Sequence, residues 1–466
     1  MSRFHIAFVV LAARFLGSRI GAAASTESRC MERARKKRNK EIRKCNQNPE
    51  PECVERAKKK FQKKKKKCLR PCLAWNQIGD DIDGDVPSDG FGGAVRLSAD
   101  GSRMAVGARG GGEAGRGRVI ILERNGEDWV QVGGPIDGSD AGDAMGTLSL
   151  SANGSAVAVG SHWYNSFSGQ VRVFALKEKS WEQVGGDILG EDAQDWFGYN
   201  LSLSGDGKTL AVGAPSRSTG AGARSGYVRV YRPDAVSGAW WQAGSDIDGE
   251  AAGDQSGVHV ALSADGDTLA VGAWQNAGNG YDSGHVRVLK WDGKRWVQAG
   301  GDIDGESEND RSGWFLSLSA DGTTLAVGAI YNNEDRGHVR IHRFDEKAQS
   351  WAQLGKDLDG KAPKDQFGRS MSLSADGNTV AIGGRWHDGA GGENSGHARA
   401  FSWDGKKWSQ IGGDMDGEAP GDWFGSQVSL SLDGSVVAVG GPNNDGAGSA
   451  AGHVRVFELG PCGSKN

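Results

Sequence analysis

Downstream of residue 70, short apolar runs alternate with glycine-rich polar turns, and no segment there has sustained helical periodicity. A typical unit contains Leu-Ser-Leu-Ser, an Asp-Gly or Asn-Gly turn, Ala-Val-Gly-Ala, a variable loop, His-Val-Arg-Val and Trp-x-Gln-x-Gly. Asp-Gly between alternating apolar runs is a strong hairpin signal, because the tight turn needs positive φ. Each unit therefore predicts four short antiparallel strands.

This unit recurs seven times at intervals of 52 to 59 residues. Its Trp-x-Gln-x-Gly motif begins at Trp75, Trp129, Trp181, Trp240, Trp296, Trp351 and Trp408. Four strands with a period in the mid-fifties are typical of a propeller blade. The pattern predicts an all-β fold, a seven-bladed β-propeller of four-stranded blades.

The two ends of the repeat region predict how the ring closes. The chain enters at Trp75 on a fourth strand, and the first complete blade starts near Phe91. It leaves after a third strand that ends at Phe457, so the N-terminal strand should complete the seventh blade and leave no open edge. Elsewhere a short loop joins the third and fourth strands. A Cys72–Cys462 disulfide is predicted to replace that loop.

Charge separates the chain into an acidic body and a basic arm. Residues 26–70 carry 19 Lys/Arg against 6 Asp/Glu, whereas residues 71–466 carry 33 against 53. Within the arm, Cys30 and Cys45 bracket one basic segment, and Cys53 and Cys68 bracket another of equal length. Such a small segment buries little apolar surface and needs staples. We expect an antiparallel α-helical hairpin with Cys30–Cys68 and Cys45–Cys53 disulfides.

The first residues predict export from the cell. Residues 1–24 contain a charged start, an apolar run and an Ala-Ala-Ala cleavage site, so they are assigned as a signal peptide. No stretch is long enough to span a bilayer. The domain prediction is a signal peptide at 1–24, a basic Cys-rich hairpin at 25–70 and the propeller at 71–466. A secreted, extracellular location follows.

One unit carries a family resemblance. Phe197-Gly198, Gly213-Ala214-Pro215 and Gly226-Tyr227-Val228-Arg229-Val230-Tyr231 resemble the FG-GAP repeat of integrin-α-like propellers, and the resemblance spans all seven units. It implies an extracellular adhesion or ligand-binding propeller. The calcium-binding D-x-D-x-D-G loop of that family is missing between the first two strands of each unit, so calcium at that position is not implied.

Loops after the second strand and after the fourth strand are predicted to share one face of the propeller. Aromatic residues in the loops after the second strand are predicted to stack on a sugar or to anchor a protein. They are Trp163, Tyr164, Trp274, Tyr331 and Trp386. Packing between blades is the alternative for these rings.

Paired aspartates recur in the loops after the fourth strand. The pairs are Asp81/Asp83, Asp246/Asp248, Asp302/Asp304, Asp357/Asp359 and Asp414/Asp416. Short Asp side chains cap turns by accepting nearby backbone N–H groups, which is the simpler interpretation. Weak calcium binding is the alternative, because hard cations take several converging carboxylate oxygens. Either way, this face should be strongly negative.

No catalytic residue, cofactor or metal site is predicted. Histidines recur at one strand position, and blades hold equivalent positions too far apart to share an ion. The glycine-rich segment Gly110–Gly115 lies between strands, which is the wrong context for a dinucleotide site. Asn153, in an Asn-Gly-Ser sequon on a turn, is the predicted glycosylation site.

These patterns predict a secreted, non-catalytic binding or adhesion protein. The propeller face would bind a glycan or an extracellular protein, and the arm an acidic polysaccharide or other polyanion; nucleic acid is not expected. The arm residues are Arg35, Lys36, Lys37, Arg38, Lys63, Lys64, Lys65, Lys66 and Lys67. The alternatives are a glycan-active enzyme that uses the loop carboxylates and a structural matrix component. An active site should break the repeat in one place, whereas these acids follow it.

Overall fold

The computed structural model describes residues 32–33, 35–43, 52–68 and 72–462, and it divides the chain into two compact units. One unit contains the N-terminal residues through Asn76 together with the C-terminal residues from Leu459, and the other spans Gln77–Glu458. The predicted signal peptide, Cys30 and Cys45 lie outside the described residues. No helix in the described ranges is long and apolar enough to cross a membrane.

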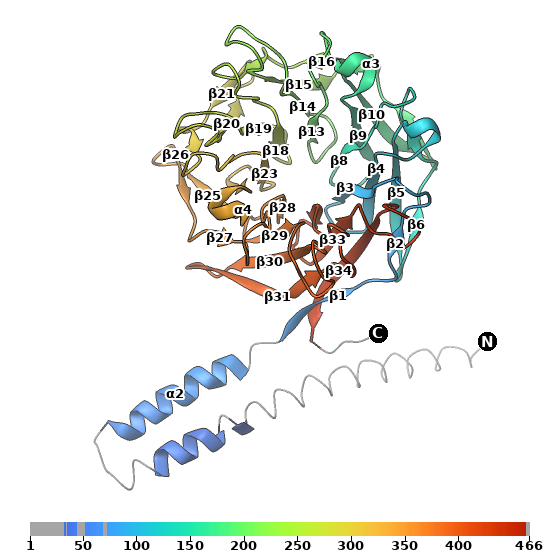
Figure 1. The fold of residues 1–466 in the computed structure, drawn as a ribbon. Helices are drawn as coiled ribbons and strands as arrows, with labels where there is room; N and C mark the ends of the chain where they lie inside the picture. The colour runs from blue at the N-terminus through green and yellow to red at the C-terminus, as the bar shows by residue number, and fades with distance from the viewer. Residues whose placement is uncertain (1–31, 34, 44–51, 69–71, 463–466) are drawn as a thin grey trace, which may run out of the picture. The chain divides into compact units, whose positions relative to one another are not determined.

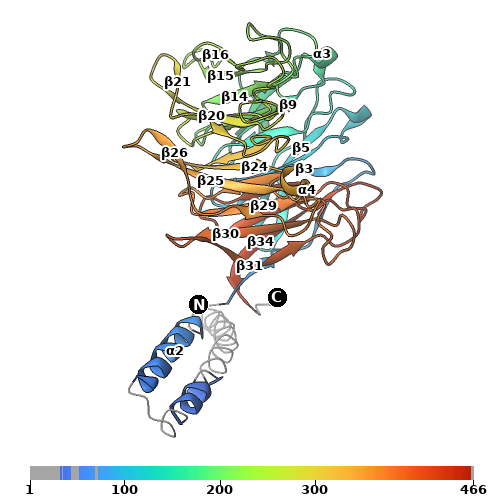
Figure 2. The same cartoon turned by 60° about the vertical axis from the view of Figure 1, so that its left-hand side comes forward.

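The basic arm is helical, as expected. Residues 35–43 form a helix that lies beside α2 (Cys53–Cys68) in Figures 1 and 2. The guanidinium carbon of Arg38 lies 4.7 Å from the ring centroid of Phe61, so the two helices contact each other through a cation–π pair. Ala57 of α2 is also buried. Cys53 is disulfide-bonded, but its predicted partner Cys45 and the side chain of Cys68 are not described.

Seven sheets form the ring in Figure 1 and confirm the seven-bladed propeller of four-stranded blades. Each blade runs from an inner first strand to an outer fourth strand, and the first strands line the central channel. The first strands are β3 (Phe91–Leu97), β8 (Thr147–Leu150), β13 (Asn200–Leu203), β18 (His259–Leu262), β23 (Phe315–Leu318), β28 (Ser370–Leu373) and β32 (Gln427–Leu430). The second strands are β4 (Arg103–Ala108), β9 (Ala156–Ser161), β14 (Leu210–Ala214), β19 (Thr268–Ala273), β24 (Thr324–Ala329), β29 (Thr379–Gly384) and β33 (Val436–Gly441).

The outer half of each blade follows the same order. The third strands are β5 (Arg118–Asn125), β10 (Gln170–Lys177), β15 (Tyr227–Pro233), β20 (His285–Trp291), β25 (His338–Asp345), β30 (His397–Trp403) and β34 (His453–Pro461). The fourth strands are β6 (Asp128–Gln131), β11 (Ser180–Gln183), β16 (Trp240–Gln242), β21 (Trp296–Gln298), β26 (Ser350–Gln353), β31 (Trp408–Asp416) and β1 (Leu73–Gln77).

Short elements that the sequence did not predict complete the blades. In six blades the loop after the fourth strand turns back and pairs with the third strand. These two-residue strands are β7 (Ile136–Asp137), β12 (Ile188–Leu189), β17 (Ile247–Asp248), β22 (Ile303–Asp304), β27 (Leu358–Asp359) and β2 (Ile82–Asp83). In the blade that contains β31, the long fourth strand itself reaches this position. Single helical turns occur at η1 (Glu113–Gly115), α3 (Tyr164–Phe167) and α4 (Asn332–Asp335).

The repeated motif residues join one blade to the next. The indole Nε1 of Trp181 donates to the carbonyl of Val132 in the preceding blade at 2.8 Å, and four later units repeat this bond. The third-strand Arg172 donates to the carbonyl of Asp137 in the preceding blade at 2.7 Å. A Cβ at Gly272 would lie 2.0 Å from the carbonyl oxygen of Gly313, so neighbouring blades meet there backbone to backbone. These contacts explain why Trp, Arg and Gly recur.

The ring closes as predicted. β1 and β2 both pair with β34, and Ile82 lies opposite Val454. The guanidinium of Arg455 donates to Oε1 of Gln77 from Nε at 2.9 Å and from Nη2 at 2.8 Å. The Cys72–Cys462 disulfide is present, with Cα atoms 5.3 Å apart. The first and last segments of the propeller therefore form one blade.

Candidate ligand-binding site

One end of the central channel is surrounded by residues that change from blade to blade. The residue directly after each second strand is Arg109, His162, Pro215, Trp274, Ile330, Arg385 or Pro442. The residue directly before six of the first strands is Gly146, Tyr199, Val258, Trp314, Arg369 or Ser426. The framework motifs repeat in every blade, whereas these positions do not. A specific site is expected where the repeat is broken, so we define these two sets of residues as the channel mouth.

An aromatic groove lies at this mouth. Its cavity volume is about 270 Å³, and Trp196, Tyr199, Trp274 and Trp314 line it. The indoles of Trp274 and Trp314, from neighbouring blades, stack with ring centroids 4.4 Å apart and planes inclined by 24°. Trp196 and Tyr199 stack at 5.8 Å and 18°. Two stacked pairs therefore line one cavity.

Tyr331 and the guanidinium of Arg311 pack against the tryptophans of the groove. Tyr331 stacks on Trp314 with centroids 5.9 Å apart. The guanidinium carbon of Arg311 lies 4.7 Å from the ring centroids of both Trp274 and Tyr331, so Arg311 holds these rings in fixed positions. A groove that is rigid before binding loses less conformational entropy when a ligand arrives.

The five predicted aromatic residues do not occupy equivalent environments around the propeller. Trp274 lines the groove and Tyr331 stacks on Trp314 beside it, and both are half-buried against neighbouring residues. Trp163 is 46 % exposed and meets His162 and Phe167 edge-on. Tyr164 and Trp386 are half-buried, and Trp386 lies under the guanidinium of Arg385 at 4.8 Å.

The sequence analysis missed three residues that shape the groove. Tyr199 and Trp314 lie directly before first strands, and Trp196 lies three residues before Tyr199. The residue directly before the first strand varies between units, whereas a Phe-Gly or Ser-Gly dipeptide beside it recurs. Loops on the same face bring these residues to the aromatic residues that follow second strands.

The loop carboxylates serve the framework. The first Asp of each pair accepts a hydrogen bond from the Gln of the Trp-x-Gln-x-Gly motif, with Nε2–Oδ1 distances of 2.7 to 2.8 Å. The simpler interpretation of the sequence was that these aspartates accept backbone N–H groups. Their partner is a glutamine side chain instead, although their role is still structural. The hydrogen bond with His453, the bond from Gln77 and the charge of Arg455 outweigh burial and lower the pKa of Asp81 to about 2. These acids are held where they support the turns.

Histidines and acids also gather between blades. Groups whose nitrogen and oxygen atoms lie within 4.8 Å of one another are Asp81/Glu418/His453, Glu250/His285/Asp302, Glu306/His338/Asp357, Asp365/His387/His397 and His397/Asp414/Asp416. Most combine the repeated third-strand His with a loop Asp and a Glu from the preceding loop. Asp365/His387/His397 differs, because His387 is not a repeated histidine.

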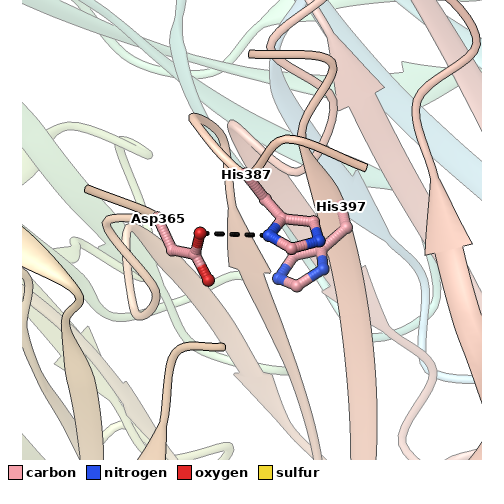
Figure 3. Close-up of side chains that lie close together, drawn as sticks. All are labelled: Asp365, His387 and His397. Atoms are coloured by element: carbon pink, nitrogen blue, oxygen red, sulfur yellow. Dashed lines mark hydrogen bonds and ion pairs between the residues drawn. The ribbon is translucent and has the colours of Figure 1, made fainter. Parts of the chain in front are cut away.

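Figure 3 shows this cluster, which is almost fully buried. Nδ1 of His387 lies 3.0 Å from Oδ1 of Asp365, and the His387 and His397 rings stack at 3.9 Å with an interplanar angle of 28°. Burial and the nearby His387 and Arg399 lower the pKa of His397 to about 3, so His397 is neutral. Lone pairs of stacked imidazoles lie in nearly parallel planes and do not converge on one point. In this arrangement the cluster is better suited to packing than to holding an ion.

The arm and the sequon can be placed only in part. Arg35, Lys36 and Lys37 are exposed, and Arg38 is half-buried against Phe61. The predicted arm lysines at positions 63–67 lie within α2, but their side chains are outside the described atoms. Asn153 is exposed on the turn between β8 and β9, and its Oδ1 accepts a bond from the backbone N–H of Ser155 at 3.0 Å.

Comparisons with known proteins give fold similarity alone. No family model matches the chain, and no curated protein matches it. Hydrazine synthase of Kuenenia stuttgartiensis is similar over 83 % of this chain and 98 % of its own, with a TM-score of 0.49 and 16 % identity. A periplasmic gluconolactonase of Pseudomonas aeruginosa, PpgL, is similar over 70 % of this chain and 85 % of its own, with a TM-score of 0.48 and 18 % identity. At these identities, neither similarity bears on function.

Proposed function

We propose that this is a secreted, non-catalytic binding protein of the FG-GAP type, which holds a glycan in the aromatic groove and a polyanion on its basic helices. The groove carries the proposal. Sugar rings present flat apolar faces of C–H groups that pack against indole and phenol rings, while their hydroxyl groups need nearby polar partners. Trp274 and Trp314 supply the rings, and Gln255, Gln275 and Arg224 supply polar groups in the same cavity.

Binding is favoured over catalysis because the acids of the propeller are engaged elsewhere. A glycoside hydrolase needs two carboxyl groups on either side of one bond. The paired loop aspartates instead follow the repeat and bond to glutamines and arginines of the framework. Within the described part of the chain, the groove is lined by aromatic, apolar, amide and guanidinium groups and by no carboxylate.

The basic helices support a second contact with a polyanion. Arg35, Lys36 and Lys37 on one helix and Lys58, Lys59 and Lys60 on the other are exposed. Among the described residues of the two helices, ion pairs join Lys36 to Glu32 and Lys58 to Glu55. The remaining positive charge favours an external anion. Disulfides at Cys53 and between Cys72 and Cys462 suit an extracellular location.

A glycan array probed with the secreted full-length protein tests the proposal. We expect Trp274→Ala and Trp314→Ala each to weaken binding of the selected glycan at least ten-fold, because each removes a stacking surface. Trp241→Ala is the matched control, since Trp241 is 48 % exposed but lies on the outer strand β16. Binding that survives both groove variants, or hydrolysis of the bound glycan, would overturn the proposal.

A further inference from the structure

The central channel has a chemical character opposite to that of the propeller around it. The channel cavity measures about 570 Å³ and is bordered by the first strands of all seven blades. Residues 71–466 have an excess of acidic side chains, yet no Asp or Glu is among the described residues that line the channel. It contains four arginines and a histidine instead, namely Arg96, Arg109, Arg369, Arg385 and His259.

Among the described residues, these four arginines lack the carboxylate partners that Arg229 and Arg455 have. Arg229 forms a two-point ion pair with Asp246, and Arg455 bonds to Gln77 and Asp416. Within the described part of the chain, none of the four channel arginines forms an ion pair with a carboxylate. Nε of Arg385 is buried without a hydrogen-bond partner, as is Nε of framework arginines such as Arg340 and Arg399. An anion in the channel would supply the acceptor that Arg385 lacks.

Aromatic rings hold two of these guanidinium groups in place. The guanidinium carbon of Arg369 lies 4.3 Å from the ring centroid of Phe315, and that of Arg385 lies 4.8 Å from Trp386. Burial and the charges of Arg385 and Arg109 lower the pKa of Arg369 to about 9. The phenols of Tyr199 and Tyr331 act in the opposite direction. Arg369 still carries its charge at neutral pH. An anion beside it would relieve the mutual repulsion of these groups.

Arg96 breaks a structural bond that the repeat provides. In five blades, a first-strand Ser at the equivalent position accepts a hydrogen bond from the backbone N–H of the next blade. The pairs are Ser149 with Leu203, Ser202 with Leu262, Ser317 with Leu373, Ser372 with Leu430 and Ser429 with Leu97. Arg96 takes this position in its own blade, where its Nη1 donates to the carbonyl of Val95 at 2.8 Å and to Oε1 of Gln427 at 3.3 Å. Ala261 takes it in the remaining blade. At Arg96, a stabilising contact is given up for a positive charge in the channel.

We propose that the channel and its mouth form an oxyanion site that receives the carboxylate of an acidic sugar whose ring lies in the aromatic groove. Tyr199, Val258 and Trp314 line both cavities, so one ligand can occupy the groove and the channel together. Arginine is suited to this task because its planar guanidinium binds carboxylate or sulfate through two parallel hydrogen bonds. The choice of a sugar rests on the proposed function, whereas the anion site does not.

Calorimetry with short ligands tests the inference on the full-length protein. A trimer of galacturonic acid is compared with its methyl ester, which keeps the chain and removes the charge. About 0.3 M NaCl screens the exposed charges of the arm. We expect the free acid to bind ten- to a hundred-fold more tightly than the ester, as charge-assisted hydrogen bonds to half-buried guanidinium groups predict. A sulfated galactose trimer distinguishes carboxylate from sulfate as the preferred anion.

Two variants locate the anion. Arg96→Ser restores the repeated serine and should fold at least as well as the natural chain, and Arg369→Gln is the conservative change. Each should reduce the preference for the acid over the ester about ten-fold or more, while Trp314-dependent binding of the ester remains. Arg295→Gln, on an exposed turn of the outer strands, is the matched control and should change nothing. An unchanged preference for the acid in both channel variants would overturn the inference.

The results also separate this inference from the proposed function. If acid and ester bind equally well through Trp314, the glycan groove stands and the anion site is wrong. If neither trimer binds but sulfate raises the Tm only when Arg369 is present, the anion site stands and the glycan function is wrong. If neither trimer binds and sulfate has no Arg369-dependent effect, both are wrong.

Discussion

Trp274 and Trp314 stack 4.4 Å apart across the boundary between two blades. Trp274 follows a second strand and Trp314 precedes a first strand, so each belongs to a position that varies around the ring. Arg311 packs against the same pair and continues the stack to Tyr331. The propeller therefore supplies a repeated scaffold, and specific chemistry enters where neighbouring blades place unlike residues side by side.

The disulfide that closes the ring should contribute strongly to stability. Cys72 and Cys462 are separated by 390 residues, and cross-linking so long a loop restricts the unfolded chain. The chain-entropy estimate for such a loop is about 6 kcal/mol. We expect a Cys72→Ser/Cys462→Ser variant to lose a large part of this free energy of unfolding in urea titrations. Equal stability of the variant and the natural chain would show that β-strand pairing alone closes the ring.

The buried Asp365 should matter more for stability than its histidine partner. Asp365 accepts bonds from the backbone N–H groups of Lys361 and Ala362, as well as from His387. Asp365→Ala leaves these donors unpaired and should cost about 2–4 kcal/mol. His387→Asn should cost less than about 1 kcal/mol, because Asn276 makes the equivalent bond to Asp254 in another blade.

Urea denaturation of both variants checks this difference. A chelator added to the natural chain should leave the midpoint unchanged, because the stacked imidazoles of His387 and His397 do not converge on an ion. Equal losses of unfolding free energy in the two variants, or a midpoint that falls with the chelator, would contradict this. Either result would show that His387 has a role beyond the hydrogen bond that Asn276 makes in another blade.

Acid should destabilise the propeller through its buried neutral histidines. Burial and the nearby charge of Arg340 lower the pKa of His342 from 6.5 to about 4. Between these values the unfolded chain binds a proton that the folded chain does not, so stability present above pH 6.5 is lost as the pH falls toward 4. His342→Phe should reduce this loss by about 1–3 kcal/mol. Thermal unfolding from pH 7.5 to 4 measures it, and identical pH profiles would contradict the assignment.

The basic helices should bind polyanions in a salt-dependent manner. Lys36→Glu/Lys37→Glu reverses two exposed charges and should weaken heparin binding about ten-fold or more at low salt, with a smaller effect at high salt. Lys406→Glu/Lys407→Glu makes the same change on an exposed turn of the propeller and should have little effect. Affinity chromatography with a salt gradient compares the two pairs. Equal elution shifts would assign the binding to overall charge rather than to the arm.

The fold was largely predictable because its framework residues repeat. Trp181, Arg172 and their counterparts join blades at fixed spacing, and a single sequence displays that spacing directly. Ring closure followed from the strand at which the chain enters and leaves, together with the flanking Cys72 and Cys462. The two-residue strands were missed because Ile-Asp within a polar loop carries no alternation over a measurable length.

The site was predicted less completely, since function here depends on departures from the repeat. Trp274 and Tyr331 were identified because they follow a recognisable strand. Trp314 and Arg369 were not, since their importance depends on which side chains face them from the adjacent blade and across the channel. Arg96 looked like one of many arginines, and only the five serine bonds at its position distinguish it.

A crystal structure of the full chain with the galacturonic acid trimer tests the central claim most directly. We predict a sugar ring against Trp274 and Trp314, with its carboxylate within hydrogen-bonding distance of the guanidinium of Arg369. Electron density for the trimer at the paired aspartate loops or on the basic helices, with an empty groove and channel mouth, would contradict the account.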